Sequence, residues 1–159
     1  MKNEEIQKAI DDLGEITLSI DYAQTVEQIV ATSGHDLNLK AVTENFPIPE
    51  EFGRKKMEVI AKLFYFNHSI SSGEVISKMD KAGYRPAILV ELLSLGTSYP
   101  EILRQFNIHI IALGYSVFQY PFNGSSGGCP VPILQRRGIE FLWFHYRWFT
   151  RPYFLAIRK

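Results

Sequence analysis

The amino-acid sequence predicts an α+β fold, in which helices and a mostly antiparallel sheet occupy different stretches of one chain. Three observations lead to this prediction. Apolar residues at helical spacing, with polar caps and glycine stops, recur in the first two thirds of the 159 residues. Residues 57–66 read as a strand with both faces largely apolar, which places it inside a sheet. After Phe106, short apolar stretches separated by turns predict four or five further strands.

Residues 1–56 are expected to hold two helices, a strand between them and a loop. Apolar residues three and four apart predict an amphipathic helix that ends at Gly14. Residues 16–22 alternate between apolar and polar, as in a half-buried strand. Thr25 can cap a second helix that ends at Gly34. Prolines, a glycine and weak periodicity predict a loop over residues 35–53.

A helix is expected directly after the strand at 57–66. Ser71 or Ser72 can cap it, its predicted span is 74–82, and Gly83 ends it.

A second helix is expected over residues 87–95, with a stripe of isoleucine and leucine. Pro86 is expected to start this helix, since proline is favoured in a first helical turn. Gly96 and Pro100 are expected to break the helical region into two pieces.

Cysteine and histidine content argues against a disulfide, a metal or a cofactor. Cys129 is the single cysteine, so neither an intramolecular disulfide nor a cysteine-based zinc site can form. Its neighbours supply no cation that would lower its pKa, which favours an unreactive thiol. The four histidines are scattered along the chain without metal-site spacing. The glycines of NGSSGG, followed by CPVP, favour a hairpin turn over a phosphate-binding loop.

The N-terminal segment lacks the apolar core of a signal peptide, and no apolar run approaches the roughly 20 residues of a membrane span. A cytoplasmic location is therefore expected.

The charges are unevenly distributed although the formal net charge is zero. Residues 1–106 carry 11 basic and 16 acidic side chains, whereas residues 107–159 carry six basic side chains against the single acid Glu140. The last third of the chain is therefore expected to present a cationic surface.

An aromatic run over residues 141–154 is the most informative segment. More than half of its side chains are aromatic, and it also contains Arg147 and Arg151. If residues 141–151 form one strand, the alternation leaves neither face polar, so a core strand alone does not explain the pattern. Some of these rings are expected in the core. The remainder, mixed with arginine and histidine, are expected to form an exposed binding patch.

Several stretches resemble a known family. These are ENFPIP, KLFYFNHSISSGEVISKMDKAGYRPAILVELLSLG, YPEILRQFNIHIIALG, VPIL and the ending FLAIRK, together with Trp143 and Trp148. They are similar to the C-type-lectin-fold variable proteins of diversity-generating retroelements, in particular the small bacterial and phage members. The resemblance covers residues 44–159. It implies a C-type-lectin-like binding domain over residues 57–159, with two helices on a mostly antiparallel twisted sheet, and residues 1–56 as an extension packed on it.

The resemblance also implies a function, which is the display of diversified residues on a C-terminal strand-and-loop surface that binds ligands, often proteins. Trp143, Trp148 and FLAIRK would be scaffold. The displayed, ligand-binding residues would be Gln135, Arg136, Arg137, Leu142, His145, Tyr146, Arg147, Phe149, Thr150, Arg151 and Pro152. We therefore expect a non-catalytic module that binds a protein or another macromolecule and needs no cofactor.

Three rival functions remain open at the level of sequence. Single-stranded nucleic acid could stack on the aromatics and pair with the arginines, although the acidic first part of the chain would repel a long polyanion. The formylglycine-generating enzymes resemble the same fold, but their chemistry relies on a cysteine pair that this sequence lacks. Residues 141–159 could also lie at a membrane interface, although their strand-like spacing is unlike an amphipathic helix.

Overall fold

The computed structural model describes residues 2–34, 46, 48–114, 130–143 and 147–159. Seven strands form a mixed sheet with the order β1-β2-β9-β5-β6-β7, and β4 also pairs with β9. The strands are β1 (Ile16–Asp21), β2 (Lys56–Tyr65), β4 (Tyr84–Pro86), β5 (Ile110–Ile111), β6 (Pro130–Gln135), β7 (Gly138–Trp143) and β9 (Tyr153–Arg158). Only the short β5–β9 pair is parallel among the described pairs. A second, two-stranded sheet pairs β3 (Ile70–Ser71) with β8 (Arg147–Trp148).

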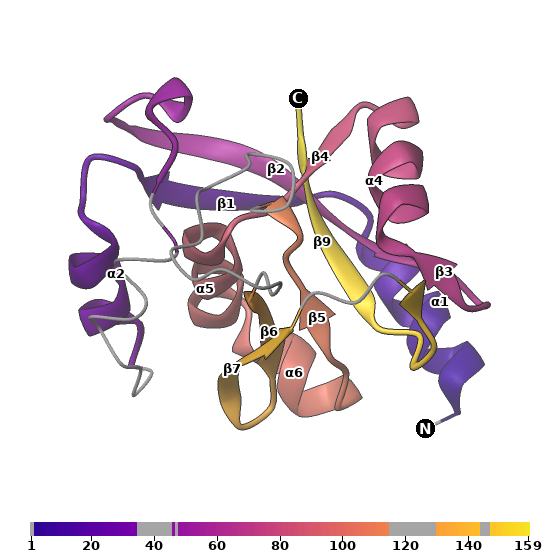
Figure 1. The fold of residues 1–159 in the computed structure, drawn as a ribbon. Helices are drawn as coiled ribbons and strands as arrows, with labels where there is room; N and C mark the ends of the chain where they lie inside the picture. Colours follow the sequence, from indigo (N-terminus) through magenta and orange to yellow (C-terminus); the bar gives the residue numbers. More distant parts are fainter. Residues whose placement is uncertain (1, 35–45, 47, 115–129, 144–146) are drawn as a thin grey trace.

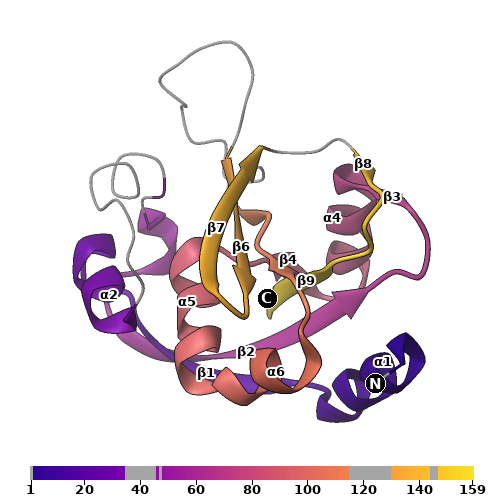
Figure 2. The same cartoon turned by 90° about the horizontal axis from the view of Figure 1, so that it is seen from below.

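Helices lie on both faces of this sheet, and the predicted α+β class is confirmed (Figure 1). They are α1 (Asn3–Leu13), α2 (Val26–Ser33), α4 (Ser72–Lys81), α5 (Leu89–Ser98) and α6 (Pro100–Phe106), with a short 3-10 turn η1 (Glu50–Phe52). Figure 2 shows the sheet curling as a half-barrel, with α5 between its β1–β2 part and its β6–β7 part. This position explains why α5 is buried on more than one helical face, through Leu89, Val90, Glu91, Leu92, Leu93 and Leu95.

The C-terminal strand β9 lies at the centre of the fold and separates two cores. Tyr153, Leu155 and Ile157 join the larger core, which contains α5, β1 and β2. Phe154 and Ala156 point to the opposite face and join the smaller core under α4. Because both faces are covered, the strand is apolar at consecutive positions rather than at alternate ones.

Several local predictions are confirmed. Thr25 caps α2 by accepting a hydrogen bond from the backbone N–H of Gln28, and Gly34 ends that helix in the left-handed conformation. Ser71 caps α4 in the same way through Glu74. In β1, the alternate residues are buried, as predicted, and they pack in the larger core beside residues from beyond position 57.

Two helix-boundary predictions are wrong. Pro86 does not start a helix but ends β4, where it pairs with Ala156 of β9, and α5 begins three residues later. Gly96 does not break α5, which continues to Ser98; only Pro100 marks the expected break, as the first residue of α6. A Cβ atom on Gly96 would lie 3.1 Å from the Leu134 side chain, so the glycine lets β6 pack closely on the helix.

The interpretation of residues 141–151 as one alternating strand is also wrong. β7 ends at Trp143, and β8 belongs to the separate small sheet, where Trp148 pairs with Ile70. The indole N–H of Trp148 donates to Ser72 Oγ at 2.8 Å, which ties this part of the chain to the start of α4.

Candidate ligand-binding site

Trp148 and Phe149 are consecutive residues with opposite environments. Trp148 is 3% exposed and packs edge-to-face on Phe154, with 5.9 Å between ring centroids. Phe149 is 74% exposed and is one of two exposed large hydrophobic residues in the described part of the chain. The hydrogen-bonded tryptophan therefore anchors a turn that presents the next side chain to solvent.

The turn between β8 and β9 is fixed to the turn between β2 and β3. Arg147 donates from Nη1 to the backbone oxygen of Ser69 at 3.3 Å and to its Oγ at 3.2 Å. Arg151 reaches Asn67 Oδ1 at 3.4 Å. Both arginines thus bind the same β2–β3 turn, and their charged groups remain partly or fully exposed.

A pocket of about 260 Å³ opens beside this turn, between α1, the end of α6 and the start of β9. We call it the aromatic pocket. Its apolar lining includes the stacked rings of Tyr65 and Tyr153, whose centroids are 4.7 Å apart, and Phe106. Its polar lining consists of Asn3, Asn107, His109, Thr150 and Arg151. Phe106 and Tyr153 are themselves buried and Tyr65 is half-buried, so the rings contribute only part of their surface to a pocket whose exposed lining is more polar than apolar.

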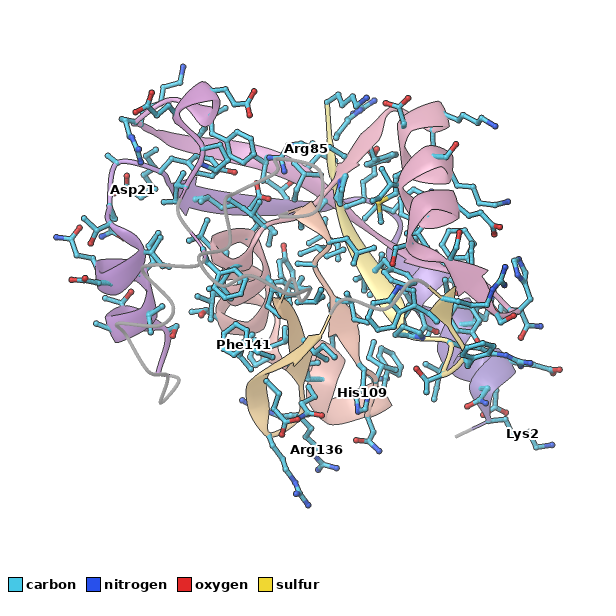
Figure 3. The ribbon with its side chains drawn as sticks, viewed as in Figure 1. Lys2, Asp21, Arg85, His109, Arg136 and Phe141 are labelled. Carbon is cyan, nitrogen blue, oxygen red and sulfur yellow. The ribbon has the colours of Figure 1, made fainter. Side chains whose placement is uncertain are left out.

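A second pocket of about 430 Å³ adjoins the first, and Asn107 and His109 line both. We call it the arginine pocket, because the β6–β7 hairpin contributes Arg136 and Arg137 to its lining, along with Gln135 and Glu140. In Figure 3, Arg136 extends away from the body of the fold at the same end of the molecule as His109. The two pockets are therefore neighbours at this end of the molecule and share Asn107 and His109 in their linings.

The backbone is in an unusual conformation at two residues of the aromatic pocket. Asn107, with φ 47°, and Arg151, with φ 53°, are the only non-glycine residues with positive φ in the described part of the chain. Asparagine adopts this left-handed region readily, but an arginine there costs on the order of 1 kcal/mol. Retaining a long cationic side chain at a strained position favours a role for Arg151 beyond folding.

The three arginines of the two pockets lack the carboxylate partners that other basic residues of this region have. Arg147 pairs with Glu74 at 3.9 Å, Arg158 pairs with Glu15 at 3.6 Å, and Lys159 pairs with Asp80. Arg136, Arg137 and Arg151 form no salt bridge with any other described residue. Of the six basic side chains in residues 107–159, the three without a salt bridge to another described residue are therefore the three that line the two pockets.

Tyr153 is the one pocket residue with a clearly shifted pKa. Burial raises the pKa of its phenol to about 12, and the negative charges of Tyr65 and Asp11 add to the effect. The phenol therefore stays neutral at physiological pH.

The displayed residues predicted from sequence divide into four groups. Arg136, Arg137, Phe149, Thr150 and Arg151 are exposed, and all except Phe149 line a pocket. Gln135 and Arg147 are half-buried, while Pro152 is buried in the lining of the aromatic pocket. Leu142, like the predicted scaffold residue Trp143, lies in β7. His145 and Tyr146 lie outside the described residues, as do Cys129 and the NGSSGG segment.

The structure adds pocket residues that the sequence did not single out as ligand-binding. Tyr65, Phe106, Asn107 and His109 come from segments far from the aromatic run. Asn107 carried a usable signal, since an asparagine after a helical pattern is a common left-handed C-cap.

A buried polar cluster elsewhere in the fold serves a structural role. Glu91 is fully buried and accepts hydrogen bonds from Tyr22 at 2.5 Å and from both terminal nitrogens of Arg85 at 2.9 and 2.6 Å. Its Oε1 also accepts the backbone N–H of Ile88 at 2.9 Å, which closes the start of α5. Burial and the neighbouring Glu91 carboxylate raise the pKa of Tyr22 well above its ordinary value. The cluster links β1, β4 and α5.

Among the described residues, no group of three or more His, Cys, Asp or Glu side chains could hold a metal ion. No helix in the described ranges is long and apolar enough to cross a membrane. No model of a known protein family matches the chain, and no curated protein or solved structure matches it.

Proposed function

We propose that this protein is a non-catalytic ligand-binding module, which presents an aromatic and basic surface to a protein ligand. The observation that carries the proposal is the pair Trp148 and Phe149. An anchored, buried tryptophan directly precedes a phenylalanine that is 74% exposed and lies two residues before Arg151 of the aromatic pocket. Single exposed apolar residues are common on proteins, so the proposal rests on the combination of Phe149 with the exposed arginines of the same turn and of the β6–β7 turn.

The chain order supports a C-type-lectin-like scaffold of the variable-protein type. Helices α4 and α5 are followed by α6 and then by β5 to β9. The FLAIRK segment, scaffold under this proposal, is buried through Phe154 to Ile157 in the middle of the sheet. Six of the eleven candidate displayed residues lie instead in the β6–β7 and β8–β9 turns, namely Arg136, Arg137, Phe149, Thr150, Arg151 and Pro152.

Recognition under this proposal combines two physical contributions. Burial of Phe149 against a partner removes apolar surface from water, and each arginine can pair with a carboxylate in a charge-assisted, bidentate geometry. Aromatic and arginine side chains are also those that contribute most to binding at protein interfaces. Neither contribution requires a chemical step.

A displayed library tests the proposal. Arg136, Arg137, Phe149, Thr150 and Arg151 are randomised together on the surface of yeast, and a control library randomises five buried residues, namely Leu18, Leu92, Ile110, Trp148 and Leu155. We expect most members of the first library to resist protease, and only a few members of the second library to do so. Selection of the first library against unrelated proteins should yield specific binders. Loss of folding in the first library, or a folded library without binders, would argue against a display surface.

A further inference from the structure

We infer that the two adjoining pockets bind an acidic peptide segment, with carboxylates in the arginine pocket and an apolar side chain in the aromatic pocket. This inference rests on the proposed function and names the chemistry of its ligand. The inferred ligand would contact Asn107 and His109 as well as the β6–β7 and β8–β9 turns.

The charges of the site favour carboxylate ligands. Arg136 and Arg137 are adjacent, exposed and without a salt bridge to any other described residue, and Arg151 contributes a third guanidinium that no described carboxylate pairs with. A guanidinium group binds a carboxylate through two parallel hydrogen bonds, and this geometry matches planar anionic groups. The single carboxylate in the lining, Glu140, forms no salt bridge with either arginine.

The aromatic pocket can hold an apolar side chain next to those charges. Tyr65, Phe106 and Tyr153 give it an aromatic lining, and the shared residues Asn107 and His109 connect it to the arginine pocket. The exposed amide and imidazole side chains at this junction can donate to, or accept from, a peptide backbone. A ligand that spans both pockets therefore has an apolar part and an anionic part, separated by a polar connection.

The distribution of acidic residues favours a short acidic peptide over a nucleic acid. Helix α1, which lines the aromatic pocket through Asn3 and Ile6, carries Glu4 and Glu5 in its first turn. Asp11 on the same helix is close enough to raise the pKa of Tyr153. A phosphate backbone that continued from the arginines past α1 would meet these carboxylates, whereas a few peptide carboxylates would not.

Peptide titrations of the isotope-labelled protein test the inference. The probes are acetylated and amidated Glu-Glu-Ser-Phe and its reverse Phe-Ser-Glu-Glu, matched peptides with Gln in place of Glu or Ser in place of Phe, and a short oligothymidylate. We expect at least one acidic probe to shift the backbone amide signals of Asn107, His109, Arg137 and Arg151. The Gln and Ser probes should bind more weakly, the Gln probe by about tenfold or more, because a hydrogen bond to a charged group contributes at least that factor.

A charge-reversal pair provides the matched control. Arg136→Glu with Arg137→Glu should weaken the best acidic probe by about tenfold or more, while Arg54→Glu with Lys55→Glu, an exposed basic pair before β2, should leave its affinity nearly unchanged. Equal binding of the Gln probe, tighter binding of the oligothymidylate, or no shift at the pocket amides in a folded protein would each overturn the inference. Such outcomes would reject the acidic peptide as the ligand but not the proposed function, which the displayed library tests separately.

Discussion

At the scale of single residues, the site depends on a contrast between buried anchors and exposed neighbours. Trp148 contributes a buried ring, an edge-to-face contact with Phe154 and a hydrogen bond to Ser72, whereas Phe149 has most of its surface in solvent. Arg151 combines a constrained backbone with an exposed side chain, since its backbone is in the left-handed conformation.

Alanine substitutions at Trp148 and Phe149 should therefore have very different effects. Trp148→Ala should cost ~3–5 kcal/mol of unfolding free energy, because it leaves a cavity and removes the indole hydrogen bond to Ser72. Phe149→Ala should change the same quantity by only about 0.5 kcal/mol, as exposed positions usually do. Urea denaturation measures both. If Phe149→Ala destabilises as much as Trp148→Ala, the phenylalanine belongs to the core and the display surface loses its main support.

Tyr153 should make the fold sensitive to alkaline pH. Its folded-state pKa of about 12 lies above the ordinary value of 10.0, so its contribution to stability is complete below pH 10 and is lost as the pH rises toward 12. One such group changes the unfolding free energy by at most ~1.4 kcal/mol per pH unit in that range. Denaturation midpoints of Tyr153→Phe should thus fall less steeply between pH 10 and 12 than those of the wild type. Identical slopes would show that the phenol is not desolvated.

Sequence reasoning at the residue scale succeeded where local chemistry decides. The caps at Thr25 and Ser71 follow from side chains that lie close in sequence to the groups they satisfy. The aromatic run could not be divided correctly, because the direction of β8 is set by contacts with Ser72 and Ile70, which lie far away along the chain.

At the scale of elements, α5 and the strands around it depend on close backbone approach. Gly96 lets Leu134 of β6 lie against α5, and Gly114 donates its N–H to the backbone oxygen of Ala87 at 2.8 Å, just before that helix. A Cβ atom on Gly114 would lie 2.6 Å from that oxygen and 2.7 Å from Ile88 Cγ2. The junction between β5 and α5 therefore requires glycine at this position.

Two Gly→Ala substitutions should act in opposite directions. Gly114→Ala should lower the unfolding free energy by ~1–3 kcal/mol, because the backbone oxygen that it meets cannot move freely. Gly73→Ala, in the first turn of α4, should raise it by ~0.4–1 kcal/mol, since the nearest atom would be 4.0 Å away and alanine favours helix. Equilibrium denaturation of both variants compares them directly. A neutral Gly114→Ala would show that β5 can shift away from α5.

The element predictions failed where tertiary contacts override local preference. Pro86 is favoured in a first helical turn, yet pairing with Ala156 places it in a strand. Gly96 usually weakens a helix, yet the helix continues through it because it is enclosed by the curled sheet.

At the scale of the whole molecule, salt bridges hold three of the six basic side chains in the last third of the chain, and the other three line the two pockets. Carboxylates from the earlier, acidic part of the chain pair with Arg147, Arg158 and Lys159, while Arg136, Arg137 and Arg151 line the two pockets. The sequence alone predicted the cationic last third of the chain. It could not predict which arginines remain without a carboxylate partner, because their potential partners lie far away along the chain.

The position of the pockets was likewise inaccessible from sequence. The predicted residues lie in the β6–β7 and β8–β9 turns, but the pocket linings also need α1, β2 and the α6–β5 connection, which only the folded sheet brings together. The resemblance implied a scaffold role for FLAIRK, and its residues Phe154 to Ile157 are buried in a strand that is covered on both faces.

The measurement that tests the central claim most directly is the unfolding free energy of one combined variant, Arg136→Ser, Arg137→Ser, Phe149→Ser and Arg151→Ser. If these residues are displayed by an independent scaffold, urea denaturation should give a value within about 2 kcal/mol of the wild type, with an unchanged dependence on urea. Removing three uncompensated positive charges could even raise the value at low salt. A loss of more than about 4 kcal/mol would show that the four side chains hold the fold together, and would contradict a separable recognition surface.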